Sequence, residues 1–160
     1  MSLNFKIEQV ALAPHDPEKA IALLARMGAG EWARDHVKAS GRVFGVGGTN
    51  EADLAFEYDI LKDAKELEVL HYTDGPNWLE ENAAERVDHD GRVSHLGMHC
   101  TERELAQWKF FFQQEGIREA QSVRTFSHTN PVIAGKRTYQ YVIFDTRAIL
   151  GVDIKFIVRL

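Results

Sequence analysis

The sequence predicts an α+β fold made of two tandem β-α-β-β-β modules. Two observations support this prediction: short β-rich segments surround single amphipathic helical segments, and the same order of segments occurs twice, in residues 4–72 and 92–159. Residues 73–91 form a linker with turn signals at both ends. A length of 160 residues favours one domain over residues 1–160.

The first module opens with a predicted strand over residues 5–13, where apolar residues alternate with polar ones apart from one slip near Gln9. Asp16 supplies a helix N-cap, Pro17 fits the first helical position, and Gly28 ends the helix. Three further β-rich segments complete the module, at residues 37–46, 54–60 and 67–72.

The second module repeats this order, starting with a predicted strand over residues 93–99. Thr101 and Glu104 have the spacing of a capping box, and Gly116 ends the helix that follows. Its apolar stripe predicts three core residues, Leu105, Trp108 and Phe112. The last three predicted strands cover residues 117–126, 139–144 and 152–158.

The composition disfavours several classes of function. The formal net charge is −5 with both signs interspersed, which does not suit a nucleic-acid partner. No apolar stretch approaches the ~20 residues that span a bilayer, and the start has no signal-peptide pattern. Cys100 is the single cysteine, which fits a reducing compartment. We therefore expect a cytoplasmic protein that binds neither nucleic acid nor membrane.

The two modules align with each other at their first and last strands. Residues 7–11 (Ile-Glu-Gln-Val-Ala) match residues 93–97 (Val-Ser-His-Leu-Gly), and residues 66–70 match residues 153–157. This arrangement resembles the vicinal oxygen chelate superfamily, which includes glyoxalase I, methylmalonyl-CoA epimerase, extradiol dioxygenases, and fosfomycin-resistance and bleomycin-binding proteins. The resemblance implies curved mixed sheets that form an open cup, with metal ligands on the first and last strand of each module.

The resemblance implies a metal site at Gln9, Glu68 and His95, a set similar to that of the eukaryotic kind of glyoxalase I. The metal would be a divalent ion such as Zn, Ni, Mn or Fe. Lys155 departs from the pattern, because it stands where the family has a second glutamate. A charged ammonium group has no lone pair to offer a metal and repels a nearby cation.

Two functions remain open from the sequence. In the first, the protein is a metal-dependent lyase or isomerase that acts on a small oxygenated molecule, with Glu68 and Lys155 as candidate catalytic residues. In the second, it is a non-catalytic module for binding small molecules, similar to bleomycin-resistance proteins. This module has lost the metal, and Lys155 anchors an anionic group or pairs with Glu68.

Strand alternation adds four candidate ligand-binding residues: His99 on the face of His95, Asp153 on the face of Lys155, and Tyr139 and Tyr141 together on one face of the strand before the last. A homodimer is also expected, because members of the superfamily associate and because curved open sheets leave free edges. Whether the cup forms within one chain or between two chains is left open by the sequence.

Overall fold

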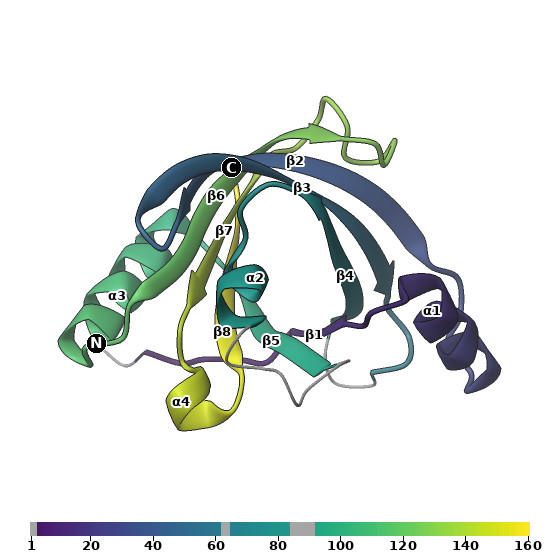
Figure 1. The fold of residues 1–160 in the computed structure, drawn as a ribbon, viewed down its shortest axis with the longest axis horizontal. Helices are drawn as coiled ribbons and strands as arrows, with labels where there is room; N and C mark the ends of the chain where they lie inside the picture. Colours follow the sequence, from purple (N-terminus) through teal and green to yellow (C-terminus); the bar gives the residue numbers. More distant parts are fainter. Residues whose placement is uncertain (1–2, 62–64, 84–91) are drawn as a thin grey trace.

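The computed structural model describes residues 3–61, 65–83 and 92–160. Its eight strands form one closed barrel in the order β1-β4-β3-β2-β6-β7-β8-β5 (Figure 1). The predicted α+β class and the two β-α-β-β-β modules are confirmed.

The first module contains four strands and one helix. Asp16 caps the helix as predicted, because its Oδ1 accepts a hydrogen bond from the backbone N–H of Lys19 at 3.0 Å. The strand β4 runs parallel to β1, and β3 lies antiparallel between β4 and β2. The elements are β1 (Gln9–Ala13), α1 (Pro17–Arg26), β2 (Ala33–Val43), β3 (Val46–Glu57) and β4 (Glu66–Asp74).

The second module has the same plan with two extra helical turns. The capping box at Thr101 and Glu104 is present. The helix α2 lies within the linker. The helix α4 was not predicted, because its four residues are too few for helical periodicity to show. The elements are α2 (Trp78–Ala83), β5 (Arg92–Cys100), α3 (Glu102–Gln114), β6 (Glu119–His128), β7 (Tyr139–Phe144), α4 (Arg147–Leu150) and β8 (Asp153–Arg159).

The hairpin between β2 and β3 differs from its prediction. The sequence predicted separate strands over residues 37–46 and 54–60, but the turn between β2 and β3 consists of Phe44 and Gly45 alone, with φ of 47° and 81°. Two consecutive residues with positive φ form the tight type of turn that suits the twist of a hairpin. Gly47 and Gly48 therefore belong to β3, and both strands are longer than predicted.

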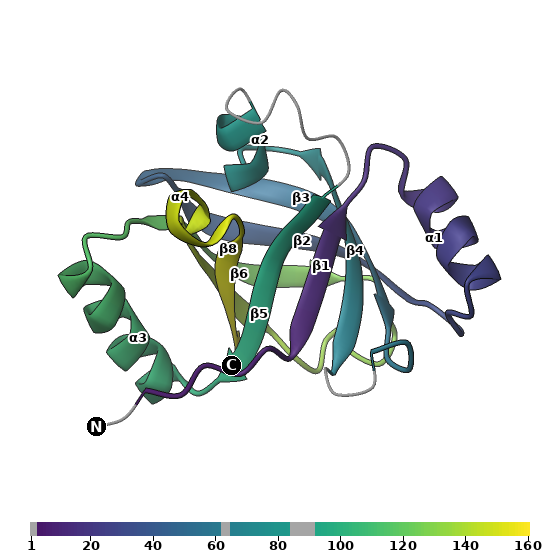
Figure 2. The same ribbon diagram turned by 90° about the horizontal axis from the view of Figure 1, so that it is seen from below.

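The two modules close the barrel within a single chain. Strand β1 pairs antiparallel with β5, and β2 pairs antiparallel with β6 (Figure 2). The predicted cup is thus a closed barrel, and each of its described strands has two neighbours. The free sheet edges that we expected to favour association are used within the chain, so the homodimer stays a prediction that rests on the resemblance.

Apolar clusters cover the outside of the barrel on two sides. The helix α3 packs its predicted core residues against β7 and β8, where Phe112 stacks on Phe144 with centroids 4.3 Å apart. The helix α1 packs Ile21 against Ala55 and Val69. Figure 1 shows the two helices on opposite sides of the barrel. Inside, a third cluster around Trp78 fills the end next to α2.

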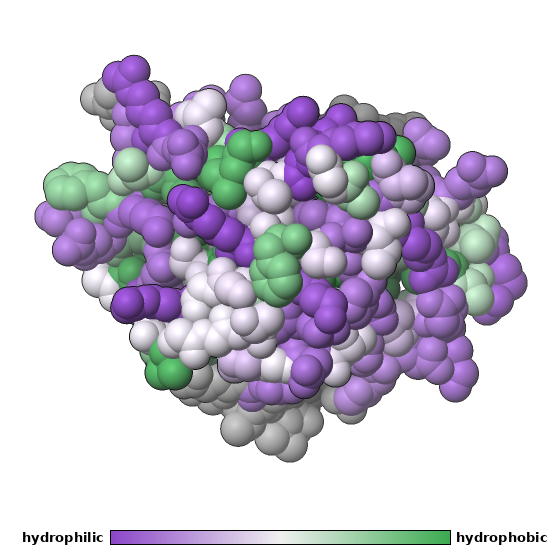
Figure 3. Space-filling model, turned by 90° about the horizontal axis from the view of Figure 1, so that it is seen from above, coloured by the Kyte–Doolittle hydropathy of each residue, from purple (hydrophilic) through white to green (hydrophobic). Residues whose placement is uncertain are grey.

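The outer face above β2 and the β6–β7 loop is mainly hydrophilic. Figure 3 shows its apolar residues in small separate groups between polar ones. The coloured part of this face therefore offers no extended apolar interface.

None of the described helices has the length and apolar character needed to cross a membrane.

We expect Gly41→Ala to destabilise the barrel where the two modules meet. Gly41 pairs with Gly48 on β3 and with Val123 on β6. A methyl group there would overlap the carbonyl oxygen of Ser122 and lie 2.7 Å from the Cα of Val123. Forcing backbone apart in this way costs roughly 1–3 kcal/mol in the free energy of unfolding.

Gly47→Ala is the matched control in the same hairpin, because its nearest contact would be 4.0 Å away. It should change the free energy of unfolding by less than about 0.5 kcal/mol. Urea denaturation of both variants measures the difference. Equal stabilities would contradict the close approach of β6 to β2 at Gly41.

Candidate functional site

Four adjacent strands direct the implied site residues into the barrel. Gln9 on β1, Glu68 on β4, His95 on β5 and Lys155 on β8 are all buried, with Lys155 5% exposed and Glu68 and His95 fully buried. The register accounts for their proximity: Ala11 pairs with both Glu68 and His95, while Gly97 pairs with both Gln9 and Lys155. The sequence alignment of the two modules therefore brought together residues that are neighbours in space.

Gln9 and His95 belong to a chain of hydrogen bonds. The Nε2 of Gln9 donates to Oε1 of Glu66 at 2.6 Å, which directs its Oε1 toward Nε2 of His95 at 2.7 Å. Burial, together with the charge of Lys155, holds the pKa of His95 well below its usual range, so the ring is neutral. A neutral ring that donates through Nε2 accepts through Nδ1, and the hydroxyl of Ser94 lies 3.1 Å from that atom.

Glu68 and Lys155 form a buried ion pair beside this chain. The Nζ of Lys155 donates to Oε2 of Glu68 at 3.3 Å and lies 4.5 Å from the centroid of the Tyr141 ring. Burial raises the pKa of Glu68, and Lys155 opposes that shift. The second carboxylate oxygen, Oε1, is buried with no hydrogen-bond partner among the described residues.

The arrangement does not fit a divalent metal ion. The ammonium group of Lys155 already bonds the Glu68 carboxylate, and it would repel a cation placed between the other three side chains. His95 and Gln9 bond each other with the atoms they would offer a metal. Among the described residues, no group of three or more His, Cys, Asp and Glu side chains is placed to hold a metal ion.

A pocket of about 410 Å³ opens above the ion pair, at the end of the barrel away from α2. This volume lies within the range of small-molecule sites, roughly 300–1,000 Å³. Lys155 and Glu68 lie on its floor, and aromatic and aliphatic side chains make up much of its walls. It is lined by Gln9, Ala33, Asp35, Phe56, Tyr58, Glu66, Glu68, His99, Asn130, Val132, Ile133, Arg137, Tyr139, Tyr141, Lys155 and Ile157.

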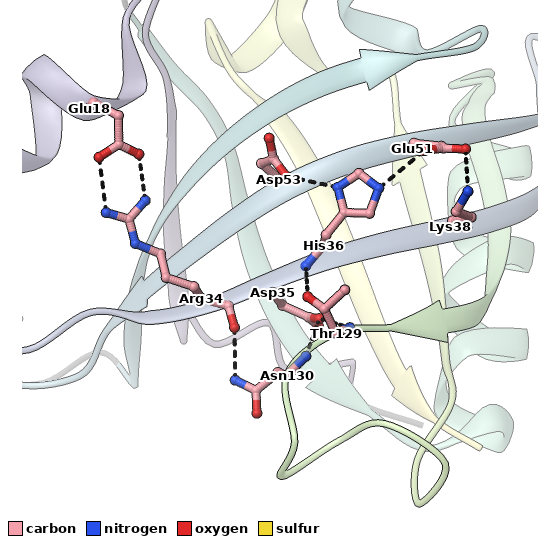
Figure 4. A network of polar contacts seen from close by, with 9 residues as sticks. All are labelled: Glu18, Arg34, Asp35, His36, Lys38, Glu51, Asp53, Thr129 and Asn130. Carbon is pink, nitrogen blue, oxygen red and sulfur yellow. Dashed lines mark hydrogen bonds and ion pairs between the residues drawn. The ribbon is translucent and has the colours of Figure 1, made fainter.

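The loop between β6 and β7 forms one wall of this pocket and is held by Asp35. The Oδ1 of Asp35 accepts hydrogen bonds from the backbone N–H groups of Thr129 and Asn130, at 2.9 and 3.0 Å. Its Oδ2 lies 2.7 Å from Nδ1 of His128. Figure 4 shows Thr129 and Asn130 beside β2, where the hydroxyl of Thr129 also accepts from the backbone of His36. The loop is therefore fixed to the opposite module.

The predicted ligand-binding residues fall into two groups. His99, Tyr139 and Tyr141 line the pocket, and the two tyrosine rings stack with centroids 6.1 Å apart. Asp153 does not line this pocket. It is buried toward α2, where its Oδ2 accepts from Nε1 of Trp78 at 3.0 Å and from Arg147 at 2.8 Å. The two-residue step from Lys155 places it too far along the strand to reach the pocket.

His95 is also absent from the lining, because Gln9 and Trp78 lie against it. Sequence reasoning missed Arg137, Tyr58 and the anchoring role of Asp35. Arg137 is part of a loop with no periodic pattern, and Asp35 contacts residues more than ninety positions away. No local sequence signal marks such contacts.

Comparisons with known proteins agree on the fold. The sequence matches no protein-family model and no curated protein. The structure is similar to methylmalonyl-CoA epimerase from Mycobacterium tuberculosis, with a TM-score of 0.54, 13% identity, and coverage of 98% of this chain and 89% of that one. A second methylmalonyl-CoA epimerase structure gives a TM-score of 0.52 at 11% identity, covering 99% and 97%.

Hypothetical protein BH1468 from Bacillus halodurans C-125 is similar as well, with a TM-score of 0.53, 12% identity, and coverage of 96% of this chain and 93% of that one. Identities this low bear on the fold alone. The chain thus shares the fold of these methylmalonyl-CoA epimerases, in agreement with the resemblance that the repeated modules indicated.

Lys155→Met should destabilise the protein by roughly 3 kcal/mol at neutral pH, because it leaves the Glu68 carboxylate buried without its partner. Burial raises the folded-state pKa of Glu68 above 4.5, so at low pH the Glu68 carboxyl group is protonated and the cost of an unpaired buried charge disappears. The loss should therefore be small near pH 4.5, grow as the pH rises, and level off above the folded-state pKa. Urea denaturation across this pH range measures it.

Lys38→Met is the matched control, because Lys38 pairs with Glu51 at 2.8 Å on the surface. Its loss should stay below about 1 kcal/mol. Equal losses for the two variants, or a loss at Lys155 that does not vary with pH, would argue against a buried pair.

Proposed function

We propose that this protein binds a small, oxygen-rich organic anion in the barrel pocket, without a metal ion. Lys155 is the anchor for an anionic oxygen of that ligand. The proposal rests on one observation: the ammonium group of Lys155 lies on the pocket floor, 3.3 Å from Glu68, at the position where the family pattern has a metal ligand.

The pocket holds two cationic groups for such an anion beside three carboxylates, of which Asp35 and Glu66 already accept hydrogen bonds from the protein. A lysine ammonium group has three N–H donors, and Glu68 takes one of them. The remaining donors can bind a carboxylate or enolate oxygen. Arg137 adds a second positive charge from the β6–β7 loop, and it forms no ion pair with any other described residue. The aromatic and aliphatic walls suit the carbon skeleton of an organic ligand.

Glu68 limits the charge that the ligand can carry into the site. An anion beside Lys155 also lies near the Glu68 carboxylate, which repels it unless that carboxylate takes up a proton. Because burial already raises the pKa of Glu68, anion binding is expected to favour its protonated form, whether the proton comes from solvent or from Lys155. Affinity should therefore increase as the pH falls toward the ordinary range of a carboxyl group.

The second candidate function is the metal-dependent lyase or isomerase. It is favoured by the convergence of Gln9, Glu68 and His95. The Nε2 of His95 lies 2.7 Å from Oε1 of Gln9 and 3.8 Å from Oε2 of Glu68. It requires Lys155 to turn away from Glu68. A metal titration of the wild-type protein separates the two candidates.

The ligand experiment compares lactate, pyruvate and malonate against sodium chloride of equal ionic strength. At a ligand concentration ten times Kd, binding should add roughly 1.4 kcal/mol to the free energy of unfolding, or about 3–5 °C in Tm. Lys155→Met should lose this ligand-dependent increase, and Lys38→Met should keep it. No increase with any of the acids in wild type would count against the proposal.

The metal experiment adds zinc, nickel, manganese or iron salts to chelator-treated protein and measures Tm. We expect no metal-dependent increase in wild type. Lys155→Glu should be less stable than wild type without metal, because two carboxylates then face each other, and should gain stability with a divalent ion. Metal-dependent stabilisation of wild type would support the lyase or isomerase candidate instead.

A further inference from the structure

We propose that Lys155 is a nucleophile that forms a reversible Schiff base with a small 2-oxo acid. This inference rests on the proposed binding function and names the class of ligand for the same pocket. It predicts covalent capture where a simple anion site would give only ionic contact.

The position of Lys155 supports the proposal. Its side chain is 7% exposed, so it touches the pocket only near its end, while Glu68 behind it is fully buried. The Tyr141 ring covers another side of Nζ, at 4.5 Å from its centroid. A desolvated lysine in a pocket with aromatic walls is a setting in which the amine acts as a nucleophile.

Glu68 is placed to manage the protons of this reaction. The Oε2 of Glu68 accepts the hydrogen bond from Nζ and can take one proton from the ammonium, which leaves an amine with a lone pair. The Glu68 side chain has no exposed surface of its own, but it belongs to the pocket lining directly beside Nζ. It is therefore adjacent to any group that becomes bonded to Nζ.

The ammonium proton of Lys155 passes first to Glu68, and the Nζ lone pair attacks the ketone carbon, so that a C–N bond forms as the C–O π bond breaks. Proton transfer from nitrogen to oxygen gives a neutral carbinolamine. The proton on Glu68 then passes to the hydroxyl group, which leaves as water while the nitrogen lone pair forms C=N. The product is an iminium ion beside the Glu68 carboxylate, and hydrolysis reverses each step.

A 2-oxo acid combines the two groups that the pocket can hold. Its ketone carbon is the electrophile for Lys155, and its carboxylate matches the positive charge of Arg137, which lines the same pocket without an ion-pair partner among the described residues. The hydroxyl groups of Tyr139 and Tyr141 are further polar groups on the wall. An acid without the ketone can bind there but cannot form the C–N bond.

The test is reductive trapping of wild-type protein with pyruvate and sodium cyanoborohydride, followed by peptide mass spectrometry. We expect a carboxyethyl adduct on Lys155 at least about tenfold in excess over the adduct on Lys38, the surface lysine that also pairs with a glutamate. Lactate, which has no ketone, should compete with the trapping and form no adduct. This comparison needs no variant and so does not depend on whether a variant folds.

Two variants refine the result. Lys155→Arg keeps the positive charge and should abolish the adduct at this position. Glu68→Gln should slow trapping about tenfold or more, and raising the pH should restore part of the rate, because solvent then removes the lysine proton although it does not replace the acid that assists water loss. A merely structural role of Glu68 would not be rescued in this way.

The outcomes separate the two proposals. If lactate and pyruvate both stabilise the protein but Lys155 is modified no faster than Lys38, the Schiff base is excluded and the anion site stands. If neither acid binds and nothing is trapped at Lys155, both proposals fail. Preferential trapping at Lys155 that lactate suppresses supports both.

Discussion

The interior of the barrel is organised around the ion pair between Lys155 and Glu68. Each residue lies on the last strand of its module, and the two strands are separated in the barrel only by β1 and β5. A buried charge is costly unless it is paired and hydrogen-bonded, so removing either residue destabilises the fold. The pair therefore links the two modules, and it also decides which ligands the pocket can accept.

The buried polar residues Gln9, Glu68, His95 and Lys155 separate two different ends of the barrel. Toward α2, Trp78 and the apolar cluster fill the interior, and Asp153 with Arg147 closes that end. Away from α2, the pocket stays open between the walls and the β6–β7 loop. A ligand that enters this pocket thus meets Lys155, with the Glu68 carboxylate directly beside its Nζ.

The internal repeat explains how much could be predicted from the sequence. Equivalent strands of two similar modules meet where the modules pair, so aligning residues 7–11 with 93–97 is enough to place Gln9 near His95. The same alignment places Glu68 near Lys155. Strand alternation alone could not tell Asp153 from Lys155, because both point inward and only their height in the barrel differs.

Other features depend on how the barrel closes, which periodicity does not reveal. The strands β2 and β6 pair across the module boundary, and this pairing brings Asp35 to the β6–β7 loop. Arg137 lines the pocket only because that loop is held there. The short turn at Phe44 and Gly45 was likewise hidden by the glycines that follow it.

The most direct measurement of whether Lys155 has replaced a metal is a crystal structure of the wild-type protein soaked in a manganese or zinc salt, with anomalous scattering data. We predict no anomalous peak beside Glu68 and an Nζ of Lys155 within hydrogen-bond distance of the Glu68 carboxylate. A peak within roughly 2.0–2.2 Å of Gln9, Glu68 and His95, with Lys155 turned away, would contradict this prediction.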